Sequence, residues 1–268
     1  LMLFYKVATT ENEWRGEVVT SEDGGATWST PNRLPDHLIG PVKNKPIQLR
    51  DGTILSGSSF EGEPGWRVHV ERSTNQGTTW KSIGPINDLN ARERYECIQP
   101  TLLEYPSGAV QMLMRNASHT GSILESWSRD RGLTWTPVEG TTLPNNNSGL
   151  DAAMLRDGRA LLVYNHSHRS HLGENIGHKG RGVLNVAVSR DGEAWEAALV
   201  LDSLEGPWRQ FSYPAVIQTR DGLVHITYTW HRKRIKHVVL DPERLVTHPI
   251  GWPTNHIPLI TSTDDIED

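Results

Sequence analysis

The sequence predicts an all-β fold of the β-propeller type, and three observations support that prediction. An eight-residue pattern ending in tryptophan occurs four times, with 52, 55 and 61 residues between successive third positions. Between these copies, an extended run, a glycine turn and a second extended run recur. No segment shows a sustained apolar period of 3.6 residues, so we expect helix only in short local stretches. Four-stranded repeats of about this length are typical of propeller blades.

The tryptophan pattern has Ser at its first position and Asp or Asn at its third. Its copies span residues 21–28, 73–80, 128–135 and, in a form one residue shorter, 189–195. The third positions are Asp23, Asn75, Asp130 and Asp191. A side-chain oxygen at this position can accept backbone N–H bonds while a glycine makes the turn and the tryptophan covers the loop. We therefore interpret the copies as structural staples of hairpins.

The runs between the staples predict four equivalent hairpins, each followed by a third strand. The hairpins begin at 45–49, 99–103, 150–154 and 213–217 and turn at 51–52, 107–108, 157–158 and 221–222. The third strands are expected at 68–71, 123–127, 183–188 and 235–240. Blades are thus predicted at 42–92, 96–142, 148–204 and 210–250, after a partial blade at about 1–35. We expect residues 1–268 to form a single propeller domain of about four and a half blades that lacks its N-terminal blade portion.

Composition excludes several classes of protein. Lys and Arg number 27 against 32 Asp and Glu, so the net charge of −5 provides no broad basic field for nucleic acid, and no apolar run is long enough for membrane insertion. The single cysteine, Cys97, excludes a disulfide framework and a cysteine-based zinc site. Histidines at 166, 168, 171 and 178 form a weak metal pattern that we interpret as a solvated loop. We expect no cofactor and no metal, and only a slight preference for a secreted or periplasmic location.

The staple sequence Ser-x-Asp-x-Gly-x-Thr-Trp resembles the Asp-box of the sialidase (neuraminidase) superfamily, and the similarity covers nearly the whole chain. Residues 40–46, 147–149 and 212–214 are most similar to the bacterial sialidase-like branch that carries BNR repeats. The resemblance implies a propeller that is six-bladed when complete and an exo-glycoside hydrolase that releases a terminal sialic acid or a related acidic sugar from a glycan. Asp-boxes also occur in carbohydrate-binding and polysaccharide-lyase propellers, so such a protein without sialidase activity is the alternative.

Strand topology predicts where a substrate would bind. The starts of the innermost strands and the ends of the second strands must meet at the end of each sheet opposite the staples. Polar and cationic side chains gather at these positions: Lys43, Asn44, Lys45, Ser58, Gln99, Arg115, Asp151, Asn165, Arg181, Tyr213 and Trp230. We therefore expect an acidic glycan to bind there.

Arg115 and Arg181 are the residues that we expect to hold a sugar carboxylate, because a guanidinium stays charged and can bond both carboxylate oxygens. The resemblance supports this choice. In sialidases an Asn-Glu-Pro segment precedes the second of three arginines by about 16 residues, and here Gln99 precedes Arg115 by 16. The third arginine precedes the catalytic tyrosine by some 30 residues, and 213−181 is 32. Either arginine could instead pair with a surface carboxylate.

Further contacts with the substrate are expected from the other polar side chains of this group. Lys43 and Lys45 would add positive charge, while Gln99 and Asn165 would bond the sugar. Neither the general acid of the family nor its first arginine can be assigned.

Tyr213 is the nucleophile that the resemblance implies, since a neutral phenol approaches a carboxylate-bearing carbon with less repulsion than a second carboxylate. In the family a glutamate draws off the tyrosine proton, but the matching position is Gln99, and an amide cannot act as a base. Asp151, Glu71 and Glu61 are the candidates to replace it, and we predict Asp151 as a catalytic acid or base. The alternatives are a hydrogen-bonded rim tyrosine at 213 and a purely structural carboxylate at 151.

Overall fold

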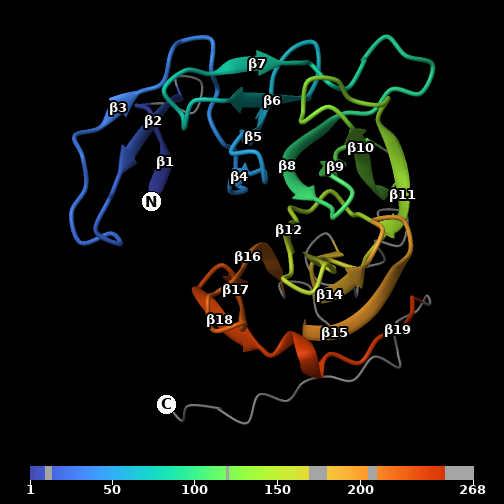
Figure 1. Cartoon of the computed structure of the whole chain (residues 1–268). Helices are drawn as coiled ribbons and strands as arrows, with labels where there is room; N and C mark the ends of the chain where they lie inside the picture. Colours follow the sequence, from blue (N-terminus) through green and yellow to red (C-terminus); the bar gives the residue numbers. More distant parts are fainter. Residues whose placement is uncertain (10–13, 119–120, 169–179, 205–209, 251–268) are drawn as a thin grey trace. The chain divides into compact units, whose positions relative to one another are not determined.

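The computed structural model describes residues 1–9, 14–118, 121–168, 180–204 and 210–250 (Figure 1). Within these ranges the chain forms five antiparallel sheets and a short 3-10 helix, η4 (Pro242–Arg244). No helix in the described part of the chain is long and apolar enough to cross a bilayer. The prediction of an all-β chain is confirmed.

The first three sheets follow the chain from one strand to its neighbour. The first contains β1 (Met2–Val7), β2 (Arg15–Thr20) and β3 (Asn32–Arg33). The second contains β4 (Ile47–Gln48), β5 (Ile54–Phe60), β6 (Arg67–Ser73) and β7 (Lys81–Ile83). The third contains β8 (Cys97–Glu104), β9 (Val110–Asn116), β10 (Ser122–Ser128) and β11 (Glu139–Pro144). Their limits agree with the predicted blades, except that β11 ends at Pro144, past the limit predicted at residue 142.

The last two sheets repeat this arrangement, with one strand added out of sequence order. The fourth contains β12 (Asp151–Met154), β13 (Ala160–Tyr164), β14 (Val183–Ser189), β15 (Trp195–Ser203) and, at its edge, β19 (His248–Pro249). The fifth contains β16 (Phe211–Gln218), β17 (Val224–Trp230) and β18 (Arg234–Leu240), which lie side by side in Figure 1. All four predicted hairpins are present, but the predicted limit of the blade at 210–250 was wrong, because β19 pairs with β15 of the fourth sheet and the fifth sheet ends with β18.

The hairpin turns depend on glycine. Gly52, Gly108, Gly158 and Gly222 have φ values of 86°, 83°, 84° and 92°, respectively. A residue with a Cβ atom is strained in this left-handed region, whereas glycine is not. The repeated Asp-Gly and Ser-Gly pairs therefore fix where each innermost strand reverses direction.

The staple at residues 128–135 shows why the pattern needs its residue types. Asp130 Oδ1 accepts the backbone N–H of Thr134 at 2.8 Å, and Oδ2 accepts the Thr134 hydroxyl at 2.5 Å. Ser128 Oγ accepts the backbone N–H of Gly132 at 2.8 Å, and the Trp135 indole N–H donates to the Gly132 carbonyl at 3.1 Å. These bonds, led by that of the Thr134 side chain, lower the pKa of Asp130 to about 2. The structural interpretation of the repeat is confirmed.

The described residues divide into two compact units. One lies within Leu1–Ser118 and Leu124–Glu139, and the other within His119–Ile123 and Gly140–Asp268. The larger core of the first unit includes Leu55, Val68 and Met112, each entirely buried. The core of the second unit includes Leu161 and Phe211, which are also entirely buried. Each unit thus has an apolar interior of its own.

Strand register places the staples away from the predicted site residues within a sheet. Arg115 lies near the end of β9, whereas Ser128, the first staple residue, pairs with Val110 at the start of β9. In the fourth sheet Asp151 and Ser189 lie at opposite ends in the same way, since they pair with opposite ends of β13. The predicted separation of staple and site is confirmed within these sheets.

Candidate functional site

Two innermost strands, β8 and β16, begin with the same irregularity. Gln99 and Tyr213 have φ values of 55° and 54°, and each is followed by a proline. The register with the neighbouring strand shifts across residues 98–101 and across residues 212–215. A left-handed backbone costs roughly 1–2 kcal/mol for a residue with a Cβ atom. Strain of this kind concentrates at functional sites, so both strand starts are candidate site positions.

In the first unit, Gln99 is held by contacts to its backbone and to its side chain. Its N–H donates to Ser59 Oγ at 3.2 Å, and its carbonyl accepts from Asn44 Nδ2 at 2.9 Å. Its side-chain oxygen accepts from the Arg115 guanidinium at 3.3 Å. Lys43 Nζ donates to Asn44 Oδ1 at 2.8 Å. The structure therefore brings together Lys43, Gln99 and Arg115, three of the predicted substrate-binding residues.

An aromatic ring supports the arginine of this group. The Arg115 Cζ atom lies 5.7 Å from the ring centroid of Trp66, in the geometry of a cation–π contact. Sequence reasoning missed Trp66, although it is a tryptophan outside the four staples. Lys45, another predicted substrate-binding residue, is half-buried on the segment that leads into β4. One face of the guanidinium thus rests on an indole while its edge reaches Gln99.

In the second unit, a buried arginine lies against the predicted nucleophile. Arg181 is 6% exposed, and its Nε donates to Ser148 Oγ at 2.9 Å while a terminal nitrogen donates to the Asn147 carbonyl at 3.2 Å. Its Cζ atom lies 5.6 Å from the ring centroid of Tyr213, which is 37% exposed. A fixed positive charge and an accessible phenol are thereby placed together.

The carboxylate of Asp151 is committed to backbone bonds. Asp151 is 2% exposed, and its two oxygens accept the N–H groups of Ala152 and Val216, each at 2.9 Å. Val216 follows the irregular start of β16, so the carboxylate fixes β12 to the strand that carries Tyr213. These contacts favour the structural alternative that the sequence left open, and a catalytic role for Asp151 stays a prediction.

Asn165 and His166 follow β13 and are both buried. The Asn165 amide donates to the Val183 carbonyl at 2.6 Å and to the Phe211 carbonyl at 2.9 Å, so it joins two strands, and its predicted contact with substrate stays a prediction. His166 is 3% exposed, its Nδ1 lies 2.6 Å from the Tyr164 hydroxyl, and burial lowers its pKa to about 4. A solvated position was therefore wrong for His166, while residues 171 and 178 lie outside the described part of the chain.

The other carboxylates considered as bases differ in exposure. Glu71 is 2% exposed and accepts the N–H groups of Ile39 at 2.6 Å and Gly40 at 2.9 Å. Burial raises its pKa even though these bonds act in the opposite direction. Glu61 is exposed and follows β5 directly. Glu71 therefore has a structural use, and among the residues that the structure describes neither Glu71 nor Glu61 has contacts that mark it as a base.

The family of BNR repeat-like domains matches residues 1–226 of the 268. The chain belongs to this family. The matched range contains all four staples, and the five sheets of the described residues are blades of the β-propeller that sialidases share. The predicted fold class and the resemblance to sialidase-like BNR proteins are confirmed.

A curated relative and several solved structures are sialidases by name. A sialidase of Micromonospora viridifaciens is 26% identical over 166 residues, which are 60% of this chain and 25% of that protein. The chain therefore spans about a quarter of this relative's length.

Solved structures with low sequence identity support the fold. A variant of the NanB sialidase from Streptococcus pneumoniae is 17% identical, with a TM-score of 0.62 over 87% of this chain and 36% of that one. The Hadza microbial sialidase Hz136 is 21% identical, with a TM-score of 0.63 over 88% and 45%. A protein of unknown function from Dyadobacter fermentans is also 21% identical, with a TM-score of 0.62 over 84% and 63%. These likenesses show a common propeller fold.

Proposed function

We propose that this BNR-repeat protein is a sialidase-like exo-glycoside hydrolase that releases a terminal sialic acid or a related acidic sugar from a glycan. The observation that carries the proposal is the buried Arg181 guanidinium beside the ring of the exposed Tyr213. The names of the relatives add support, since sialidases recur among them.

The pair in the second unit suits attack on a carbon that already bears a carboxylate. A phenol carries no negative charge before it reacts, so repulsion by the sugar carboxylate is small. As the phenol oxygen gains negative charge or the carboxylate binds, the fixed guanidinium of Arg181 offers an opposite charge that needs no rearrangement. Tyr213 is therefore the proposed nucleophile of a retaining reaction.

The group in the first unit suits recognition rather than proton transfer. Arg115 is oriented by Gln99 and Trp66 and offers N–H donors to sugar oxygens, with Lys43 as a further cation. The side-chain oxygen of Gln99 already accepts from Arg115, and an amide takes up no proton at ordinary pH. The base that serves Tyr213 must therefore be another group than residue 99.

Covalent trapping tests this proposal directly. The protein is incubated with a fluorinated sialosyl fluoride, digested and analysed by mass spectrometry, and sialic acid release from fluorogenic sialosides and Kdn glycosides is measured in parallel. We expect an adduct on the peptide that contains Tyr213, its absence in Tyr213→Phe and its presence in the control Tyr5→Phe. The hydroxyl of Tyr5 is bonded to Glu17 in the first sheet, far along the chain from Tyr213.

Two results would count against the proposal. Turnover of sialosides by Tyr213→Phe at the wild-type rate would exclude the tyrosine nucleophile. Release of unsaturated products from uronic-acid polymers, with no hydrolysis of any sialoside, would establish the lyase alternative instead.

A further inference from the structure

A cavity of about 270 Å³ lies in the first unit, and none of the predicted site residues lines it. Its walls come from the loop between β5 and β6, from the first residue of β6 and from the segment that follows β7. They include Pro64, Arg67, Pro85, Asp88, Leu89 and Arg94. Pockets for drug-sized ligands measure roughly 300–1,000 Å³, so this volume suits a single sugar unit.

The cavity is linked to the Arg115 group through two neighbouring residues, the last of the loop before β6 and the first of β6. Arg67 lines the cavity, and the ring of Trp66, the residue before it, packs against the Arg115 guanidinium. Ser59 pairs with Val68 across β5 and β6 and accepts the N–H of Gln99. The cavity therefore lies at the same end of the sheet as the strand start at residue 99.

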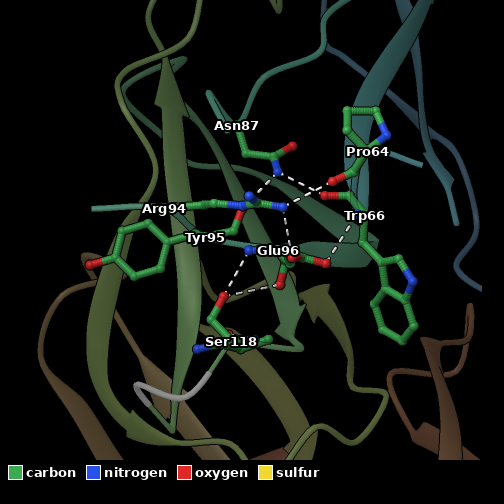
Figure 2. Close-up of polar contacts among 8 residues, drawn as sticks. Pro64, Trp66, Asn87, Arg94, Tyr95, Glu96 and Ser118 are labelled. Atoms are coloured by element: carbon green, nitrogen blue, oxygen red, sulfur yellow. Dashed lines mark hydrogen bonds and ion pairs between the residues drawn. The ribbon is translucent and has the colours of Figure 1, made fainter. Parts of the chain in front are cut away.

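The walls are held by a dense set of polar contacts, shown in Figure 2. Arg94 donates to the Pro64 carbonyl at 2.9 Å and to Glu96 Oε1 at 3.1 Å, and Glu96 Oε2 accepts the N–H of Trp66 at 3.3 Å. The Asn87 amide donates to the carbonyl of Trp66 at 2.9 Å. The Trp66 ring points away from the Arg94–Glu96 pair. These contacts fix the walls of the cavity.

Besides Arg94 and the acidic Asp88, the charged lining of the cavity includes Arg67. Its side chain makes no hydrogen bond or ion pair with any other residue that the structure describes, although it is half-buried. The charge of Arg94 is offset by Glu96 at 3.1 Å, and Asp88 is exposed with Oδ1 bonded to the N–H of Asn90 at 2.8 Å. A half-buried arginine with no bonded partner among the described residues favours an anion, because its planar donors match a carboxylate or sulfate.

We propose that this cavity binds the acidic group of a sugar unit, a carboxylate or a sulfate, with Arg67 as its charge partner. Pro64, Pro85 and Leu89 provide apolar surface for the face of a sugar ring. The ligand is taken to be a glycan because of the proposed function, but the binding itself does not require hydrolysis. The protein would then discriminate between glycans by a charge other than that of the terminal sugar.

Binding measurements without turnover test this site. Titration calorimetry with three oligosaccharides of equal length, one carboxylated with hexuronate units, one sulfated and one neutral, is performed on the whole chain carrying Tyr213→Phe. None of the three contains sialic acid, so loss of hydrolysis and loss of this site are separate results. Arg67→Gln is compared with Arg129→Gln, which removes the same charge from an exposed residue at the staple end of the third sheet.

We expect an acidic oligosaccharide to bind at least tenfold more weakly to Arg67→Gln than to the parent chain, with Arg129→Gln unchanged and the affinity falling as salt is added. The comparison of hexuronate with sulfate identifies which acidic group is preferred. Equal affinities in Arg67→Gln and Arg129→Gln, equal binding of the neutral oligosaccharide, or no binding of any of the three would each overturn the proposal. Unchanged melting temperatures show that both variants remain folded.

Discussion

Replacement of Asp151 by Asn distinguishes a carboxylate that positions a strand from one that acts on substrate. The native carboxylate accepts backbone N–H groups of Ala152 and Val216, each at 2.9 Å, and is 2% exposed. Asn retains one oxygen, so its NH₂ group must face one of these two N–H donors. A hydrogen bond to a charged group contributes about 1.5–3 kcal/mol, and a buried unsatisfied donor costs about 1–3 kcal/mol. We expect the free energy of unfolding to fall by about 2–4 kcal/mol.

Denaturant unfolding followed by tryptophan fluorescence measures this change. The matched control is Asp36→Asn, since the Asp36 side chain is 84% exposed and its pairing with Arg33 lies at the surface. We expect the control to change the free energy of unfolding by no more than about 0.5 kcal/mol. Turnover by Asp151→Asn should fall together with stability, because Val216 follows the strand start that presents Tyr213.

The opposite combination would refute this reasoning. If Asp151→Asn unfolds at the wild-type denaturant concentration but has lost its turnover, the carboxylate does not hold β16 and acts on the substrate. The catalytic role predicted from the sequence would then be the better account.

Three more predictions concern the nucleophile, the staples and pH. Tyr213→Phe should lower turnover by on the order of 10³ or more yet change the free energy of unfolding by less than about 1 kcal/mol, as steady-state kinetics and denaturation can check. Trp195→Ala should cost about 3–5 kcal/mol of stability, because the ring is 7% exposed, while Trp28→Ala, at 42% exposed, should cost far less; equal melting shifts would contradict the staple interpretation. The pKa of Asp130 is lowered to about 2 in the folded chain, so its bonds stabilise the fold above its unfolded pKa near 3.9, and this contribution is lost as pH falls toward 2. Asp130→Asn should therefore flatten the decline of stability between about pH 4 and pH 2, and an equally steep decline in the variant would refute this account.

The staples and hairpins could be predicted because each depends on bonds within a few residues of sequence. Asp130 bonds Thr134, and Trp135 bonds Gly132, so residue type and spacing specify the loop without reference to the rest of the fold. The same is true of the hairpin glycines, whose positive φ angles require the residue that the sequence provides.

The site could be predicted only in outline. The spacing of Arg115 from Gln99 was informative because both belong to one hairpin, and the structure shows them bonded. The contact of Arg115 with Trp66 was not predictable, since it joins a strand end to a loop 49 residues earlier through packing that has no sequence period. The burial of His166 was missed for a similar reason, because a polar neighbourhood in sequence does not reveal what covers a side chain in space.

The start of strand β8 has an evolutionary consequence. The backbone at Gln99 is anchored through its own N–H and carbonyl, to Ser59 and Asn44, and by the proline that follows, so these anchors would be available to any side chain at that position. A single codon change there can therefore exchange an amide for a carboxylate while the blade folds as before. Among homologues, such an exchange would leave thermostability unchanged, and lineages could gain or lose a carboxylate at residue 99 without passing through a poorly folded intermediate.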